Sequence, residues 1–116
     1  MKTLVLPYPP SANRYWRSDR GGRPHLSDEA RAFRGAVQMR LLTQRMPLLE
    51  GEVAVTIAVY RPAKRGDLDN TIKVLLDALK GFAYLDDSQV TLLSAERFDD
   101  KANPRAEVVV TAREAA

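Results

Sequence analysis

Two hydrophobic periodicities follow one another in the middle of the chain and limit the folds it can adopt. Residues 52–61 alternate apolar and polar side chains, which is typical of a β-strand with one buried face. Between residues 68 and 79 the apolar side chains recur at helical spacing, on one face: Leu68, Ile72, Leu75, Leu76 and Leu79. Lys80 and Gly81 then provide a cation and a glycine at the helix end. The segment is therefore predicted to form a strand, a short loop and an amphipathic helix.

Acidic residues gather at both ends of this predicted helix. Asp67 stands at the expected N-cap, Asp69 follows in the first turn, and Asp86 and Asp87 come after the helix. Two carboxylates about 5 Å apart repel by roughly 3 kcal/mol at an effective dielectric constant near 20. A helix N-terminus offsets only about 0.3–1 kcal/mol per anion, whereas a divalent cation would remove the conflict.

A structural interpretation of the same acids is also compatible with their spacing, and spacing alone favours it. Asp67 is then only a cap, and Asp69 and Lys73 form a surface pair at i,i+4, beside Asp77 on one polar stripe. Asp86 and Asp87 simply belong to a turn. Both interpretations nevertheless remain open.

The rest of the chain predicts one domain, residues 1–116, of the α+β (mixed α/β) class. We expect a strand at 2–6 ended by Pro7, a long mobile basic loop at 11–27, and a helix from Ser27 to Pro47. The helix should bury Ala30, Phe33, Val37, Leu41 and Gln44 and expose Arg31, Arg34, Gln38 and Arg45. Further strands are expected at 89–97, with both faces partly covered, and at 106–112, separated by a turn at 99–104. This order predicts a small mixed sheet of about four strands packed with two main helices.

Composition restricts the chemistry. The chain has no cysteine, which excludes disulfides, thiolate nucleophiles and zinc–thiolate sites, and it has a single histidine, His25. A metal site would therefore use oxygen ligands and favour Mg²⁺ or Mn²⁺. No apolar run approaches the roughly 20 residues of a membrane span, and the N-terminus lacks signal-peptide features, so we expect a cytoplasmic protein.

Basic residues are unevenly distributed although the net charge is only +3. Four arginines occur within ten residues and are interleaved with Tyr15 and Trp16: Arg14, Arg17, Arg20 and Arg23. Such a cluster is typical of a phosphate-binding surface whose aromatic side chains stack on unpaired bases. The alternative is that these side chains only solvate a loop.

Three separated motifs, taken in order, resemble the RusA family of Holliday-junction resolvases. They are residues 6–16 (LPYPPSANRYW), residues 65–70 (RGDLDN) with Lys73 and Asp77-Ala78-Leu79, and residues 81–90 (GFAYLDDSQV). The likeness runs from the first predicted strand to the last and covers nearly the whole chain. Its ordered combination is specific, whereas a D-x-D pattern alone is common.

The resemblance implies a homodimeric, Mg²⁺-dependent endonuclease that cuts four-way DNA junctions by paired incisions. It has no small-molecule cofactor and no membrane partner. By position, Asp67, Asp69 and Asp87 correspond to the metal-binding and catalytic carboxylates, Lys73 to the catalytic lysine, and Asp86 to a further ligand. The implied DNA-binding residues are Asn13, Arg14, Tyr15, Arg17, Arg20, Arg23, Lys64 and Arg65. Gly66 departs from relatives that carry an arginine there, which implies weaker junction binding or slower cutting with the metal site retained.

Two other functions remain as alternatives. One is a non-catalytic DNA-binding or junction-capping protein in which the acids are structural. The other is a Mg²⁺-dependent hydrolase of small phosphate esters, although the chain lacks a Gly-rich phosphate loop.

Overall fold

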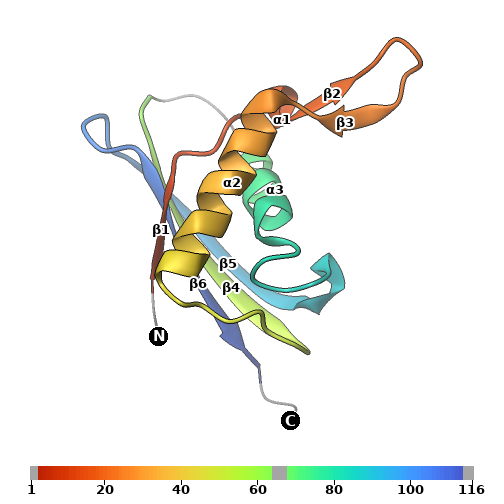
Figure 1. Cartoon of the computed structure of the whole chain (residues 1–116). Helices are drawn as coiled ribbons and strands as arrows, with labels where there is room; N and C mark the ends of the chain where they lie inside the picture. Colours follow the sequence, from red (N-terminus) through yellow and green to blue (C-terminus); the bar gives the residue numbers. More distant parts are fainter. Residues whose placement is uncertain (1–2, 64–67, 114–116) are drawn as a thin grey trace.

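A four-stranded mixed sheet with helices on one face forms the body of the molecule (Figure 1). The structure is a computed structural model and describes residues 3–63 and 68–113. In chain order the elements are β1 (Leu4–Pro7), α1 (Ala12–Tyr15), β2 (Trp16–Ser18), β3 (Pro24–Leu26), α2 (Asp28–Thr43), β4 (Val53–Arg61), α3 (Leu68–Leu79), the 3₁₀ helix η1 (Asp87–Gln89), β5 (Val90–Asp99) and β6 (Arg105–Ala112). The α+β class predicted from the sequence is confirmed.

The sheet has the strand order β1-β6-β4-β5. β4 and β5 run parallel, so the chain must cross over between them, and α3 makes that crossover. The β1–β6 and β6–β4 pairs are antiparallel, with Leu4 opposite Val108 and Ile57 opposite Val108. The first strand therefore lies against the last one in chain order.

The core fills the space between the sheet and helices α2 and α3. β4 buries Val53, Val55, Ile57 and Val59 and thus confirms the predicted alternation. The buried helical side chains are Ala30, Phe33, Val37 and Leu41 from α2 and Val74, Leu75, Ala78 and Leu79 from α3. Full burial of one such Leu, Val or Phe side chain stabilises the fold by about 1.5–3 kcal/mol, so this apolar layer holds the helices on the sheet.

Helix boundaries follow from local capping. Ser27 begins α2 as expected, because its Oγ accepts a hydrogen bond of 3.1 Å from the backbone N–H of Ala30. The prediction that α2 continues to Pro47 is wrong. The helix ends at Thr43, since Arg45 takes a positive φ of 54° and Met46 N–H bonds back to the Leu41 carbonyl. Gly81, with a φ of 88°, follows α3 as predicted.

Two further expectations are corrected. Residues 11–27 are not one long loop, because they contain α1 and the antiparallel β2–β3 ribbon, which pairs Trp16 with Leu26. β5, an edge strand, is not covered on both faces: Val90 and Ala95 are half-buried, and its other residues are exposed. No helix within the described ranges is long and apolar enough to cross a membrane.

Candidate active site and nucleic-acid interface

The polar stripe of α3 carries two exposed groups of opposite charge, Asp69 and Lys73. Asp69 lies in the first turn, where the free N–H groups and the helix dipole favour an anion, and its Oδ1 accepts a 3.0 Å hydrogen bond from the Asn70 N–H. Lys73 is exposed one turn later. Both residues belong to the described part of the chain, and they form no ion pair with each other. The i,i+4 pair of the structural interpretation is therefore absent. Both groups are therefore directed to solvent rather than to each other.

Asp86 and Asp87, beyond the end of α3, have different surroundings. The Asp86 carboxylate caps η1 by accepting hydrogen bonds from the N–H and Oγ of Ser88, and these bonds hold the pKa of that carboxyl below its usual value. The Gln89 side chain completes the cap and also donates to the carbonyls of Leu49 and Gly51, which fixes η1 beside the start of β4. Asp86 therefore has a structural role in this turn.

The neighbouring Asp87 side chain is exposed. Its negative charge adds to the effect of burial in raising the pKa of Tyr84 well above its usual range. The hydroxyl of the buried Tyr84 donates to the Leu76 carbonyl in the second half of α3. Of the two adjacent acids, Asp87 is the more available to a ligand.

The acids do not form a complete metal centre among the described residues. Asp69 belongs to the first turn of α3, and Asp87 belongs to the turn that follows this helix. No three His, Cys, Asp or Glu side chains within 3–63 and 68–113 are grouped closely enough to hold a metal ion. Asp67, Lys64 and Arg65 lie outside the described residues, so the convergence of Asp67 with the other acids stays a prediction.

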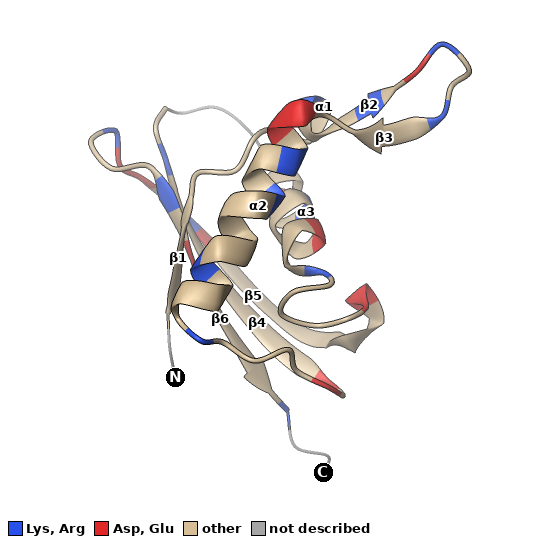
Figure 2. Ribbon diagram, viewed as in Figure 1, with Lys and Arg blue, Asp and Glu red and all other residues tan. Residues whose placement is uncertain are grey.

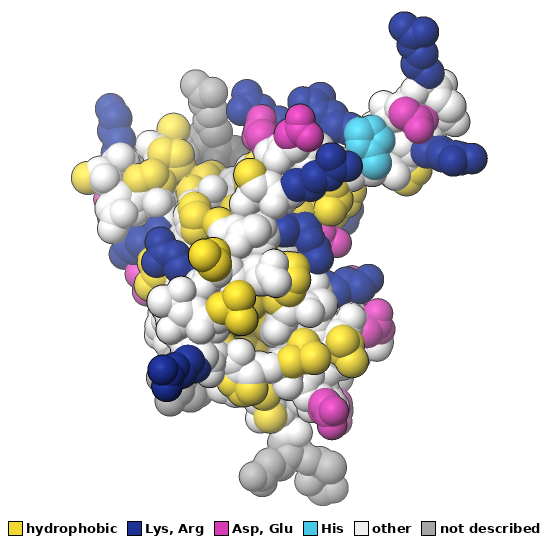
Figure 3. All heavy atoms as spheres, in the orientation of Figure 1, with side chains coloured by type: hydrophobic (Ala, Val, Ile, Leu, Met, Phe, Trp, Pro, Cys, Tyr) yellow, Lys and Arg dark blue, Asp and Glu magenta, His cyan; other side chains and the backbone are white. Residues whose placement is uncertain are grey.

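The basic segment is an ordered projection that leaves the body of the molecule. β2, β3 and their connection, residues 16–26, form the arm seen at the upper right of Figure 1. Lys and Arg recur along the arm and along α2 (Figure 2), and in the space-filling view basic side chains stand out from the end of the arm (Figure 3). Arg17, Arg20 and Arg23 are all exposed.

One carboxylate shapes the tip of the arm. Oδ1 of Asp19 accepts hydrogen bonds from the N–H groups of Gly21 (2.9 Å) and Arg23 (3.0 Å). Gly22 has a φ of 77°, a conformation that glycine adopts without strain. The turn therefore displays Arg20 and Arg23 from a formed backbone rather than from an irregular loop.

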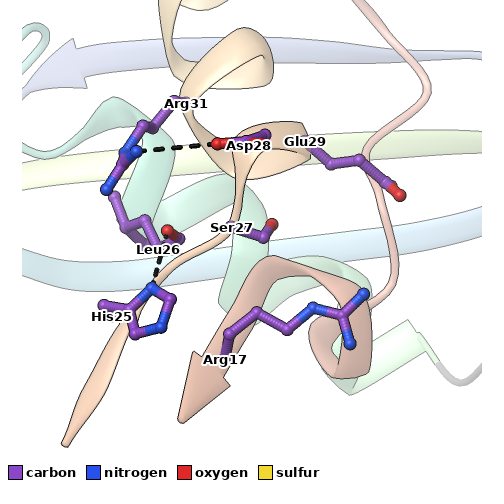
Figure 4. Close-up of a pocket in the computed structure, with 7 residues that line it drawn as sticks. All are labelled: Arg17, His25, Leu26, Ser27, Asp28, Glu29 and Arg31. Carbon is purple, nitrogen blue, oxygen red and sulfur yellow. Dashed lines mark hydrogen bonds and ion pairs between the residues drawn. The ribbon is translucent and has the colours of Figure 1, made fainter. Parts of the chain in front are cut away.

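A surface pocket of about 310 Å³ lies at the root of the arm, where β2 and β3 meet the start of α2 (Figure 4). Arg17, His25 and Arg31 line it together with Asp28 and Glu29, and Arg31 lies 3.6 Å from Asp28. The mixed charges offset one another, and the pocket is not a concentrated anion site. The arm beyond it is the more strongly basic surface.

Two residues of the sequence-based assignment lie elsewhere than expected. Tyr15 has no exposed surface, which contradicts a direct contact with DNA, because its ring belongs to the core and its hydroxyl bonds to Asp77 at 2.6 Å. Arg34, expected to face solvent, is half-buried and pairs with the same carboxylate at 3.2 Å. The preceding Asn13 and Arg14 are exposed on α1. The sequence contained no signal for the Tyr15–Asp77 contact, since 62 residues separate the two positions.

Comparison with known proteins decides the family. The model of the family "Endodeoxyribonuclease RusA" matches residues 7–111. The chain belongs to this family. Crossover junction endodeoxyribonucleases RusA of Shigella sonnei strain Ss046 and of Escherichia coli strain K12 are each 36% identical over 112 residues, covering 94% of this chain and 92% of the relative. The protein of the same name from Enterobacteria phage 82 is 36% identical over 111 residues, covering 93% and 92%. The resemblance recognised in the sequence is confirmed.

Proposed function

We infer that the protein is an endodeoxyribonuclease that resolves Holliday junctions, four-way DNA intermediates of recombination, by hydrolysing phosphodiester bonds in paired incisions. The observation that carries this conclusion is the family match over residues 7–111 together with the near full-length relatives named crossover junction endodeoxyribonuclease. The projecting basic arm is consistent with a polyanionic substrate.

A divalent cation is part of the proposal, Mg²⁺ with Mn²⁺ as a possible substitute. The donors fit such an ion: Asp69 and Asp87 present exposed carboxylate oxygens, and the chain contains no thiol that would favour a softer metal. Asp67, Asp69 and Asp87 would hold the ion, with Asp86 occupied mainly as a cap. When bound, the cation supplies Lewis-acid stabilisation of the charge that develops on the reacting phosphodiester.

Lysine and arginine side chains of the protein supply the other interactions with the DNA phosphates. Lys73 lies one helical turn from Asp69 and forms no ion pair among the described residues, so its ammonium group is free to stabilise a phosphoryl oxygen. Arg17, Arg20 and Arg23 bind duplex phosphates, which fixes orientation without reading base sequence. Asn13 and Arg14 extend this surface onto α1.

We propose a homodimer as the functional form. Paired incisions require two sites acting on one junction, and each chain carries one set of the acids discussed above. A closed two-fold dimer supplies two such sites in a symmetrical arrangement.

Cleavage of a synthetic four-way junction, run beside a linear duplex of equal length, tests the function. Symmetric nicks on the junction alone are expected with Mg²⁺, and none with EDTA. Asp69→Asn should lower cleavage by at least about 100-fold with junction binding retained, because it removes a ligand charge. Asp28→Asn is the matched control: this acid also lies in the first turn of a helix, is fully exposed, and should cut like the wild type.

Other outcomes separate the alternatives. Binding without cutting under any divalent metal would identify a junction-capping protein. Equal cutting of junction and linear duplex would retain the nuclease and reject the resolvase. A small-phosphate hydrolase would show little salt dependence of DNA binding, whereas several phosphate contacts give a steep slope of log K against log salt.

A further inference from the structure

Asp77 joins three separate elements of the fold at one carboxylate. Tyr15 of α1 donates its hydroxyl to Oδ2 over 2.6 Å, and Arg34 of α2 donates from Nη1 to the same oxygen over 3.2 Å. Arg34 also donates to two main-chain carbonyls near the end of α3, those of Asp77 and Lys80, and its guanidinium lies 5.1 Å from the centre of the Phe82 ring. One carboxylate therefore ties α1 and α2 to α3.

This contact differs from the candidate metal ligands although it belongs to the same stripe. Asp69, Lys73 and Asp77 follow one another at i, i+4 and i+8, so Asp77 lies about 12 Å along the helix from Asp69. The Asp77 side chain is 30% exposed and already accepts two hydrogen bonds, whereas Asp69 is exposed. The Asp77 side chain therefore contributes to packing between the helices, whereas Asp69 and Lys73 on the same stripe face the solvent.

The other end of this connection is the root of the arm. Tyr15 directly precedes Trp16, the first residue of β2, and the two rings meet edge to face at 4.6 Å. Ser27, which follows β3, donates its N–H to the Tyr15 carbonyl and its Oγ to the Arg14 carbonyl. Both strands of the arm are therefore fastened at Tyr15, and the Tyr15 hydroxyl is fastened to α3.

The Tyr15 hydroxyl is a dependable donor in this position. Burial, together with the hydrogen bond to Asp77, raises the pKa of Tyr15 well above its usual range, so the phenol keeps its proton at neutral pH. The Tyr15 side chain has no exposed surface, so the hydroxyl itself is shielded from water.

We propose that Tyr15 and Asp77 are positioning residues that hold the arm in a fixed place relative to Asp69 and Lys73. DNA bound by the arginines of the arm then presents one particular phosphate to α3. The inference rests on the proposed nuclease function for its consequence, but the fixed geometry of arm and helix is a property of the chain alone. Misplacement of a substrate by about 1 Å can cost about 100-fold in rate, which is why such a connection matters.

Tyr15→Phe tests the connection with the smallest change, since it removes the hydroxyl and keeps the ring in the core. Tyr84→Phe is the matched control: it removes an equally buried hydroxyl that also bonds to α3, but at the Leu76 carbonyl and with no link to the arm. On a four-way junction we expect Tyr15→Phe to lower kcat by about 10- to 100-fold with KM within about threefold. Its cuts should spread onto neighbouring phosphates, whereas Tyr84→Phe should keep the wild-type cut positions.

Variants of the acceptor give a graded response. Asp77→Ala should spread the cuts as Tyr15→Phe does, and Asp77→Asn should partly restore the wild-type positions because its amide oxygen still accepts the hydroxyl proton. If all variants lose thermal stability but keep the wild-type cut positions and kcat, the residues are merely structural and the proposal is overturned.

A distance measurement decides the question without cleavage. The chain has no native cysteine, so spin labels can be attached at Ser18→Cys on the arm and Asn70→Cys on α3, both exposed positions. The distribution of label distances should be narrow in the otherwise wild-type and Tyr84→Phe proteins and at least about twofold broader with Tyr15→Phe, because the hydrogen bond between the root of the arm and Asp77 of α3 is lost. An unchanged width with Tyr15→Phe would overturn the proposal. If the wild type cuts no junction, the proposed function fails while this measurement still tests the connection.

Discussion

Arg34 offers the sharpest test of how the helices are held together. Its side chain is 24% exposed, and it makes three hydrogen bonds: two to α3, at the carboxylate and the carbonyl of Asp77, and one to the carbonyl of Lys80, which follows the helix. Hydrogen bonds to charged groups contribute about 1.5–3 kcal/mol each. Two of the three share one nitrogen and the site is partly exposed, so the sum is discounted to about 3 kcal/mol for Arg34→Met.

Methionine is the informative replacement because it keeps most of the alkyl packing and removes the guanidinium. With an m-value of about 1.5 kcal/mol per molar urea, a loss of about 3 kcal/mol lowers the unfolding midpoint by about 2 M. Arg34→Lys keeps the charge but not the planar fork, and it should recover about 1 kcal/mol of that loss. Urea unfolding followed by circular dichroism measures both variants.

Arg31→Met is the matched control on the same helix. Arg31 is 67% exposed and lies 3.6 Å from a fully exposed Asp28. A pair of this kind contributes less than about 0.5 kcal/mol, so its midpoint should move by less than about 0.3 M urea. If Arg34→Met and Arg31→Met shift the midpoint equally, the contacts of Arg34 with α3 do not stabilise the folded state and the reasoning fails.

Two further predictions concern local caps. Ser27→Ala should lower the free energy of unfolding by about 1–2 kcal/mol, because it removes the acceptor for the Ala30 N–H, and thermal unfolding against an exposed Ser18→Ala control checks this. The pKa of Asp86 is below its ordinary 3.8 in the folded state, so its stabilising effect is complete above that value and disappears as the pH falls through the lower folded-state pKa. The Asp86→Asn variant should therefore lose less free energy of unfolding than the wild type as the pH falls from about 5 to about 2. Urea unfolding at a series of pH values measures this loss, and an equal loss in both proteins would contradict the prediction.

The regular elements could be predicted because their information is local. The alternation along β4 and the helical spacing along α3 each specify a buried face without reference to distant residues. Ser27 likewise marks the start of α2 in the sequence, because its side chain caps the backbone N–H of a residue only three positions later. For these elements the sequence was sufficient, whereas the end of α2 at Thr43 was missed although the contacts that set it are also local.

The other errors arise where the deciding contact is distant. The arm has strands of three residues, with Pro24 inside one of them and two glycines in the turn, and such short strands leave no periodicity to read. Tyr15 among arginines resembled a surface aromatic, but its ring belongs to the core and its hydroxyl bonds to a carboxylate 62 residues away. Arg34 was predicted to lie on the exposed face of its helix, but its partner Asp77 lies 43 residues away in the sequence.

The candidate site was predicted from family motifs more than from physics. Spacing alone did not separate Asp69 and Asp87 from Asp86, although the structure distinguishes an exposed Asp87 from a capping Asp86. Ser88 and Gln89 were the available clue, because an Asp followed by such residues is typical of a capping box. The role of Asp67 remains a prediction.

The pairing of β1 with β6 has a consequence for how the chain folds. Leu4 meets Val108, so a ribosome that synthesises the chain from its N-terminus exposes β1 long before its partner strand exists. β4, α3 and β5 follow one another in sequence and can assemble while synthesis continues, whereas the edge next to β6 closes only late. Until then Leu4 and Leu6, which the finished fold buries, remain open to chaperones.

The same arrangement brings the two ends of the described chain to one side of the sheet, which makes this fold a good candidate for circular permutation.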